Sequence, residues 1–212
     1  KTVPFPRQIL GAIFEWLPKK LPWQGKKWGA LRISYRPEGW CFQFCALEKD
    51  SSGVALPLVI YRDKSWRAGL PPFLKKPASP CVTSFKERMG KSLAREVDVL
   101  LRDSRGRVIE SRIWSLIFKE ASGNWIIPEH PQSLKSLSLF QLQEKLNTKG
   151  ESVRVQEIYT ADLCKLQGAW LTNSVRGVRA IQEVYDELGT PYWLPGSSEL
   201  EAQRLQDLLF GP

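Results

Sequence analysis

Residues 170–181 read WLTNSVRGVRAI: an apolar run enters a Thr-Asn-Ser turn, and an Arg-Gly-Val-Arg segment follows. A turn of small hydroxyl and amide side chains after a strand can aim backbone N–H groups and hydroxyls at a phosphate. Such turns are common in proteins, so this one alone identifies nothing. The segments upstream of the turn supply the further evidence needed to interpret it.

Upstream, residues 97–110 read VDVLLRDSRGRVIE and predict a β-hairpin. Two apolar strands flank the Asp-Ser-Arg-Gly sequence at 103–106, whose glycine is typical of a tight turn. Glu110 ends the second strand.

Both segments resemble the class IV aminotransferases, the fold-type IV enzymes that use pyridoxal 5′-phosphate. That family includes branched-chain and D-amino-acid aminotransferases and 4-amino-4-deoxychorismate lyase. Residues 97–110 are similar to its DEALLLDxxGxVxE hairpin, and the resemblance runs from about Gly29 to Ile181. It implies an α+β fold of the D-amino-acid aminotransferase type, with a truncated N-terminal α/β layer and a β-rich C-terminal domain.

The pattern of short strands and helices, without strict βαβ alternation, also indicates an α+β fold. We expect a partial N-terminal α/β domain at 1–70, an interdomain linker rich in Pro and Lys at 71–82, and a β-rich cofactor-binding domain at 83–212. Hydrophobic periodicity predicts helices at 7–17, 83–95, 138–147, 160–166 and 198–209, and strands at 29–35, 40–47, 55–61, 97–102, 107–111, 113–119, 125–127, 153–158 and 170–171.

Pyridoxal phosphate needs a lysine, an acid for its ring nitrogen and several phosphate donors. By resemblance, Glu110 contacts the ring nitrogen. The family's Schiff-base lysine then falls on Lys76, 34 residues before Glu110, with its neighbour Lys75 as the alternative. The other reading of Glu110 is a surface glutamate, and that of Lys76 a solvated basic linker.

The resemblance also implies two phosphate-binding segments. Leu137 and Ser138 fall where the family has an Ile/Val-Thr pair at a helix start, and Ser138 is expected to cap that helix as well. The flanking glycine and arginine of the family motif are absent. The second segment is Thr172, Asn173 and Ser174, with Ser174 at the phosphate-contacting position. Arg176 fits a substrate carboxylate or, equally, a solvated face.

Two departures from the family keep a second hypothesis open. Ser115 stands where the family has asparagine, and Lys1 falls after the family's first strands and its phosphate-clamping arginine. Either the chain is part of a longer protein, or it is a degenerate homologue serving as an interaction subunit. Within the family, the 171–178 segment resembles aminodeoxychorismate lyase-type members more than branched-chain aminotransferases, and the resemblance implies formation of 4-aminobenzoate, with an amino-acid aminotransferase as the alternative.

Composition narrows the remaining classes. The chain has 212 residues and a net charge of +9, which favours anionic partners, although nucleic acid ranks last because no recognition motif accompanies the charge. Four cysteines without a CxxC pair indicate free thiols in a reducing compartment, and no metal site is expected. The single histidine, His130, lies in a Pro-Glu-His-Pro turn, where a structural or exposed role is expected rather than catalysis. A cytoplasmic or organellar homodimer without a membrane span is expected, the dimer by resemblance only.

Overall fold

The structure, a computed structural model of the chain, describes residues 29–36, 39–46, 55–62, 87 and 97–211. The chain divides into two compact units, Lys1–Asp50 and Ser51–Pro212. The predicted helix at 7–17, most of the one predicted at 83–95 and the predicted linker at 71–82 lie outside the described residues. Within them, no helix is long and apolar enough to cross a membrane.

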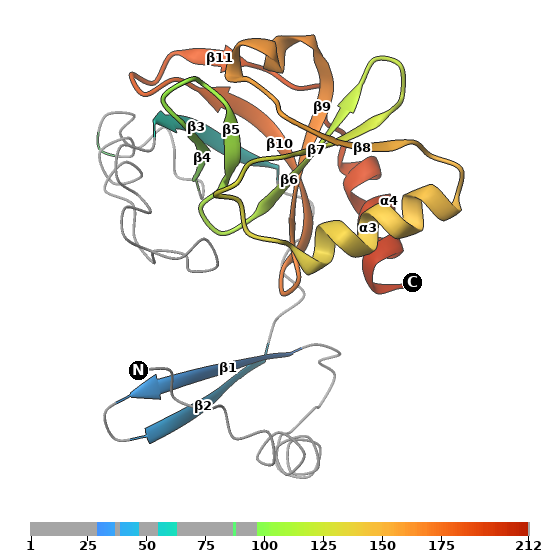
Figure 1. Cartoon of the computed structure of the whole chain (residues 1–212). Coiled ribbons are helices and arrows are strands. Elements are labelled where there is room, and N and C mark those ends of the chain that lie inside the picture. Colours follow the sequence, from blue (N-terminus) through green and yellow to red (C-terminus); the bar gives the residue numbers. More distant parts are fainter. Residues whose placement is uncertain (1–28, 37–38, 47–54, 63–86, 88–96, 212) are drawn as a thin grey trace. The chain divides into compact units, whose positions relative to one another are not determined.

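The first unit contains a β-hairpin (Figure 1). Strands β1 (Gly29–Arg36) and β2 (Gly39–Ala46) pair antiparallel, with Gly29 opposite Ala46 and Arg36 opposite Gly39. These strands confirm the hairpin predicted from alternating apolar residues at 29–35 and 40–47.

The second unit is built on a mixed sheet with strand order β5-β4-β3-β10-β9-β6-β7-β8, and β11 pairs with β10 outside this order. Strand β3 is parallel to both β4 and β10, and β7 is parallel to β8, whereas the other pairs are antiparallel. The strands are β3 (Leu56–Arg62), β4 (Asp98–Arg102), β5 (Val108–Ser111), β6 (Ser115–Glu120), β7 (Trp125–Pro128), β8 (Val153–Gln156), β9 (Leu166–Asn173), β10 (Gly177–Tyr185) and β11 (Pro191–Trp193).

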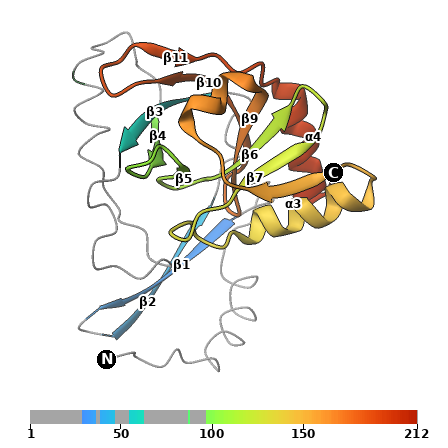
Figure 2. The ribbon, with the colours of Figure 1, turned by 45° about the horizontal axis from the view of Figure 1, so that its top comes forward.

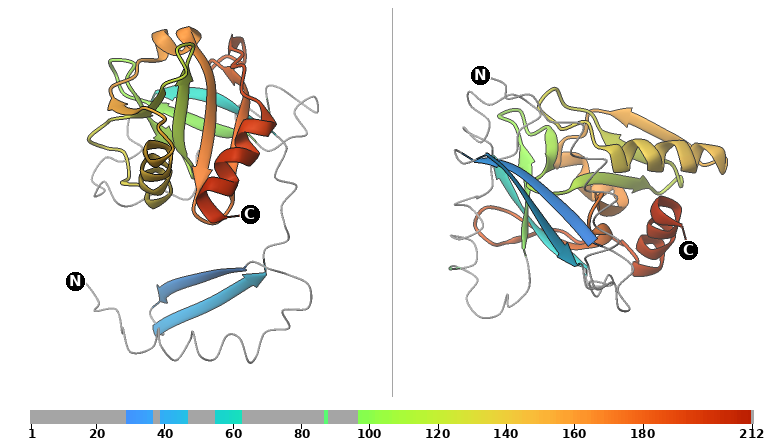
Figure 3. Two further views of the ribbon diagram at one scale, coloured as in Figure 1. Left: turned by 90° about the vertical axis from the view of Figure 1, so that its right-hand side faces the viewer. Right: turned by 90° about the horizontal axis from the view of Figure 1, so that it is seen from below.

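Each face of this sheet buries its own apolar cluster, because successive side chains of a strand point to opposite faces. On β6, Leu116 and Phe118 belong to one cluster and Ile117 to the other. The second cluster is closed by two helices, α3 (Leu137–Thr148) and α4 (Glu199–Phe210). These helices lie side by side against the sheet (Figure 3), and a short 3₁₀-helix spans Thr160–Lys165.

Most predicted elements in the described residues are confirmed, but the longest strand was not predicted. Strand β10 has nine residues and lies between β3 and β9 in the sheet. Its sequence, GVRAIQEVY, mixes charged and apolar residues, so it does not read as a buried strand. Tertiary packing decides its conformation: β9 pairs with its first half and β3 and β11 with its second.

Candidate active site

The predicted cofactor residues that the structure describes all lie in the second unit. Lys76 and its alternative Lys75 are outside the described residues. The others lie on three elements, namely β5, the start of α3 and the β9–β10 turn: Glu110, Leu137, Ser138, Thr172, Asn173, Ser174 and Arg176.

Glu110 is a core carboxylate, with only 3 % of its surface exposed. The backbone N–H of Leu134 donates to its Oε2 at 3.4 Å, and the Ser133 hydroxyl donates to the carbonyl of Ile109 at 2.5 Å. An ionised carboxylate loses its hydration on burial and therefore needs donors or charges close by. The alternative of a solvated strand-end glutamate is thereby excluded.

The segment before α3 carries the contact to Glu110 and is itself ordered by His130. The N–H of Gln132 donates to His130 Nδ1 at 3.1 Å, and the N–H of Ser133 donates to the His130 carbonyl at 3.0 Å. The imidazole Nε2 lies 3.5 Å from a carboxylate oxygen of Asp103. His130 thus has a structural role, as its position in a turn predicted.

The start of α3 is suited to an anion. Leu137 and Ser138 are its first two residues, and the N–H groups at a helix start have no partner within the helix. No acidic residue lies in the first turn, so no negative charge competes for the positive end of the helix dipole. Leu137 is 75 % exposed and contributes only its backbone, whereas Ser138 is buried.

The predicted cap of α3 was wrong by two residues. Ser136, not Ser138, is the N-cap, because its hydroxyl accepts from the N–H of Leu139 at 3.4 Å and its backbone is extended. The Ser138 hydroxyl lies 3.0 Å from the Ser136 hydroxyl. Ser138 is therefore in the first turn, where its own N–H is one of the donors.

The three residues predicted at the β9–β10 turn have different surroundings in the structure. Thr172, at the end of β9, is 1 % exposed, and its hydroxyl has no hydrogen-bond partner among the described residues. The Asn173 side chain holds the turn: Oδ1 accepts from the N–H groups of Val175 and Arg176, at 2.8 and 3.3 Å. Ser174 is exposed and lies outside the strand ladder.

Contacts between the elements bring these residues to one end of the sheet. The Asn173 side-chain amide donates to the Ile113 carbonyl at 2.8 Å, three residues beyond Glu110. Thr172 is opposite Ser115, the residue that replaces the family asparagine and is itself buried. Figures 1 and 2 both place the β9–β10 turn beside the start of α3. The arrangement joins a buried carboxylate, a helix N-terminus and a hydroxyl-bearing turn.

The two arginines after the turn differ in exposure. Arg176 is exposed in the turn, where it can meet a ligand or solvent. Arg179 is 6 % exposed, and its guanidinium lies over the Trp114 ring, 5.4 Å from the ring centroid. Of the two, Arg176 is the one exposed enough to reach a carboxylate outside the core.

A network of charged side chains and His130 surrounds the β4–β5 turn, at the opposite end of β5 from Glu110. Burial alone would raise the pKa of Asp103, but hydrogen bonds from the Arg107 side chain and from backbone N–H groups hold it at about 2. Burial lowers the pKa of His130, although the Asp103 carboxylate acts in the opposite direction. Arg107 also donates to Glu157, at 2.5 Å.

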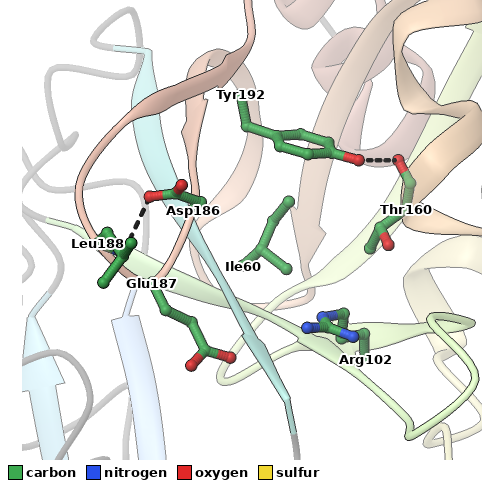
Figure 4. A pocket seen from close by; sticks show the side chains of 7 residues that line it. All are labelled: Ile60, Arg102, Thr160, Asp186, Glu187, Leu188 and Tyr192. Atoms are coloured by element: carbon green, nitrogen blue, oxygen red, sulfur yellow. Dashed lines mark hydrogen bonds between the residues drawn. The ribbon is translucent and has the colours of Figure 1, made fainter.

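A hollow of about 510 Å³ lies near Arg102, the last residue of β4 (Figure 4). Its polar groups largely hold the β10–β11 hairpin together: Asp186 Oδ1 accepts from the N–H groups of Leu188 and Thr190, and the Tyr192 hydroxyl donates to the Thr160 carbonyl. The lining residues are Ile60, Arg102, Thr160, Asp186, Glu187, Leu188 and Tyr192. None of the predicted cofactor residues lines it.

Comparison with known proteins identifies the class. Residues 46–184 match the family described as amino-transferase class IV, and the chain belongs to that family. No curated protein matched the chain.

Solved structures share its fold at low sequence identity. The PLP-bound form of a hypothetical aminotransferase from Mycobacterium tuberculosis is 17 % identical, with a TM-score of 0.67 over 98 % of this chain and 78 % of that one. A fold IV-transaminase from Curtobacterium pusillum is 17 % identical, with a TM-score of 0.63 over 96 % and 71 %. A candidate branched-chain amino acid aminotransferase from Thermotoga maritima is 15 % identical, with a TM-score of 0.63 over 85 % and 64 %. These likenesses confirm the predicted fold-type IV architecture.

Three residues of the site region did not emerge from the sequence. Leu134 contributes a backbone N–H, which no side-chain pattern encodes. Ser136 caps α3, and its position directly before an apolar run is the signal that could have found it. Gln206, on α4, contacts the β9–β10 turn from 28 residues away in sequence.

Proposed function

We propose that this chain binds pyridoxal 5′-phosphate between β5, the start of α3 and the β9–β10 turn, and acts as a class IV enzyme. The observation that carries the proposal is the buried carboxylate of Glu110, close in the fold to an anion-ready helix start. The buried Thr172 hydroxyl, without a partner among the described residues, fits a site with a polar ligand. The shared fold of the PLP-bound Mycobacterium tuberculosis protein supports the same cofactor.

Each side chain would have a defined task. Glu110 would hold the proton on the ring nitrogen, and the N–H groups of Leu137 and Ser138 would bind the phosphate together with the Ser174 hydroxyl. When bound, the cofactor supplies an electron sink for charge that develops on the substrate carbon. Lys76 would anchor the cofactor and move the proton at that carbon.

For the reaction, we propose aminodeoxychorismate lyase-type chemistry, with an amino-acid aminotransferase as the nearest alternative. The LTNSxRGV sequence at 171–178 supports the first reading. The fold relatives described as aminotransferases support the second. In either case, we propose that Arg176 binds a substrate carboxylate and that the protein is a homodimer.

Two observations favour a different class of function, a non-catalytic homologue that keeps the fold as an interaction subunit. Ser115 replaces the family asparagine, and the Asn173 side chain makes three hydrogen bonds that hold its turn. A loss of cofactor chemistry would leave these structural contacts intact.

The test is an absorbance spectrum of the full chain with pyridoxal phosphate, followed by borohydride reduction and mass mapping of the labelled peptide. Lys76→Ala should abolish the fixed label, and Lys75→Ala is the matched control that should retain it. Label on Lys75 would transfer the anchor to that residue. No label in any variant would eliminate the enzyme and leave the interaction subunit.

With a labelled protein, two assays separate the reactions. Pyruvate release from aminodeoxychorismate identifies the lyase, whereas amino transfer from branched-chain amino acids to 2-oxoglutarate identifies the aminotransferase. Activity in the second assay alone would exclude the lyase.

A further inference from the structure

The C-terminal helix contacts the start of β10, next to the candidate phosphate site, through one side chain. Gln206, partly buried on α4, accepts a hydrogen bond from the backbone N–H of Val178 at 2.6 Å. Val178 is the second residue of β10, two residues beyond the turn that carries Ser174. The helix α4 therefore contacts the backbone of β10 next to that turn.

The acceptor for the Val178 N–H comes from α4. Among the described residues, β3 pairs with β10 from Ile181 onward, and the N–H of Val178 donates to Gln206 on α4. A partly buried N–H without an acceptor costs free energy comparable to a lost hydrogen bond. The Gln206 side chain supplies this acceptor.

The Gln206 side-chain amide also packs against Gly177. This glycine has a φ of +79°, and a Cβ added to it would lie 1.8 Å from Gln206 Oε1. A glycine at this position allows both the left-handed backbone and the close approach of the amide. The first residue of β10 therefore leaves room for the side chain of α4.

The turn is thus anchored at both ends by side-chain amides. Asn173 anchors its beginning, through the N–H groups of Val175 and Arg176 and through the carbonyl of Ile113. Gln206 anchors its end. Ser174 lies between the two anchors, and Thr172 directly before them.

We propose that Gln206 is a positioning residue for the phosphate of the cofactor, acting through the β9–β10 turn. The inference rests on the proposed function, because it takes the ligand of this turn to be the phosphate group of pyridoxal 5′-phosphate. Gln206 itself does not touch the phosphate. It holds Ser174 and the neighbouring N–H groups where the phosphate oxygens need donors.

The test compares pyridoxal 5′-phosphate with pyridoxal, which lacks the phosphate, in the full chain. Gln206→Met removes the amide while keeping the length of the side chain. Gln203→Met is the matched control: Gln203 is on the same helix but exposed, and its side chain donates to Asp207. Leu205 and Leu209 keep α4 in the core in both variants.

We expect Gln206→Met to weaken pyridoxal phosphate binding about tenfold, with little change for pyridoxal, because one hydrogen bond that orders the phosphate donors is lost. Gln203→Met should leave both dissociation constants unchanged. Loss of affinity for both compounds alike would mean a merely structural role and overturn the inference. Dissociation constants for both compounds that stay at their wild-type values in Gln206→Met would also overturn it.

Hydrogen exchange of the cofactor-free chain distinguishes two outcomes: a wrong assignment of Gln206, and a chain that does not bind the cofactor at all. Gln206→Met should speed exchange of the N–H groups of residues 175–178, whereas Gln203→Met should not. A wild-type chain that binds neither compound sinks the proposed function and the phosphate role with it. Faster exchange in that case would assign the contact to the turn alone.

Discussion

Gly177 is constrained by both its backbone conformation and a neighbouring side chain. Its φ of +79° is left-handed, and Gln206 Oε1 occupies the space that a Cβ would need. We expect Gly177→Ala to destabilise the chain by about 2–3 kcal/mol, the sum of the left-handed backbone cost and the loss of the Val178–Gln206 hydrogen bond when the amide moves away from the new methyl group. The measurement is the free energy of unfolding in urea.

Gly123→Ala is the control that separates the two costs. Gly123 also has a positive φ, of +88°, but an added Cβ would meet nothing within 4 Å. This variant should lose only the backbone cost, about 1–2 kcal/mol. Equal losses in the two alanine variants would contradict the close fit of the Gln206 amide on Gly177.

His130 predicts a specific pH dependence of stability. Burial lowers its pKa in the folded chain, whereas the unfolded chain keeps the ordinary value of 6.5. As the pH falls, the unfolded chain therefore binds the proton first, and the free energy of unfolding decreases below about pH 6.5 until the lowered pKa is reached. The charged groups around the ring are Asp103, Arg107 and Glu157, and Asp103 opposes the shift.

The sequence makes this prediction clean to test, because His130 is the only histidine. His130→Asn keeps an acceptor for the N–H of Gln132 but has nothing to titrate. Urea unfolding at pH 7.0 and 5.5 should show a decrease in the wild type that is absent from the variant. The same slope in both would show that His130 is not the group responsible. A further loss of stability should follow between about pH 4 and 2, because the pKa of Asp103 is about 2.

At the scale of elements, α4 is held to the sheet by a charged cluster around Trp125. Arg204 donates to both carboxylate oxygens of Glu151, at 2.6 and 3.0 Å, and to those of Glu201, at 2.8 and 3.1 Å. The Trp125 indole N–H donates to Glu151 at 2.8 Å, and the guanidinium lies 5.9 Å from the Trp125 ring centroid. The hydrogen bonds from Arg204 raise its pKa well above the usual range and lower that of Glu151.

We therefore expect Arg204→Met to lower the free energy of unfolding by about 1–2 kcal/mol, a value between those of exposed and buried pairs. Arg204→Lys should recover little of it, since an ammonium cannot donate to two carboxylates in a planar fork. Lys165→Met is the control, because the Lys165–Asp162 pair is solvent-exposed and should leave the unfolding midpoint unchanged. A matching loss in both Met variants would refute the role of this cluster.

The elements that sequence predicts well are those whose signals are local. The β4–β5 hairpin was predicted from two apolar segments around an Asp-Ser-Arg-Gly turn, and the structure shows why those residues form it: Gly106 has a φ of +85°, and Asp103 accepts from the N–H groups of Arg105 and Arg107. Strand β10 was missed because its sequence mixes charged and apolar residues, and its parallel partner β3 comes from more than one hundred residues upstream, so no local signal marks it. The α3 cap was misplaced because two serines compete, and tertiary packing buries the second.

At the scale of the whole molecule, the candidate site is assembled from segments far apart in sequence. Resemblance to a family selected Glu110 and the 172–174 turn, and the structure brings both to one end of the sheet. Sequence could not predict that α4 would supply Gln206 to this turn, because helix–sheet docking leaves no short-range pattern. The anchoring lysine stays a prediction, since Lys76 lies outside the described residues.

The stability that the chain gains from bound pyridoxal phosphate tests the assembled site as a whole. A ligand that binds only the folded chain stabilises it by about 2.7 kcal/mol at a concentration one hundred times its dissociation constant. We expect pyridoxal phosphate to raise the unfolding midpoint of the wild type, and Glu110→Gln to lose at least about 1 kcal/mol of that gain, because an amide cannot hold the proton on the ring nitrogen. Glu129→Gln, an exposed carboxylate on the segment after β7, should keep the full gain.

The stability of the cofactor-free chain distinguishes a site residue from a structural one. Glu110 is a buried carboxylate, and burying its charge is costly, so replacement by the neutral amide should destabilise the free chain less than it reduces the cofactor-linked gain. A carboxylate that only held the core together would behave in the opposite way. The free chain would then lose most of its stability, and whatever folded would gain as much from the cofactor as the wild type does.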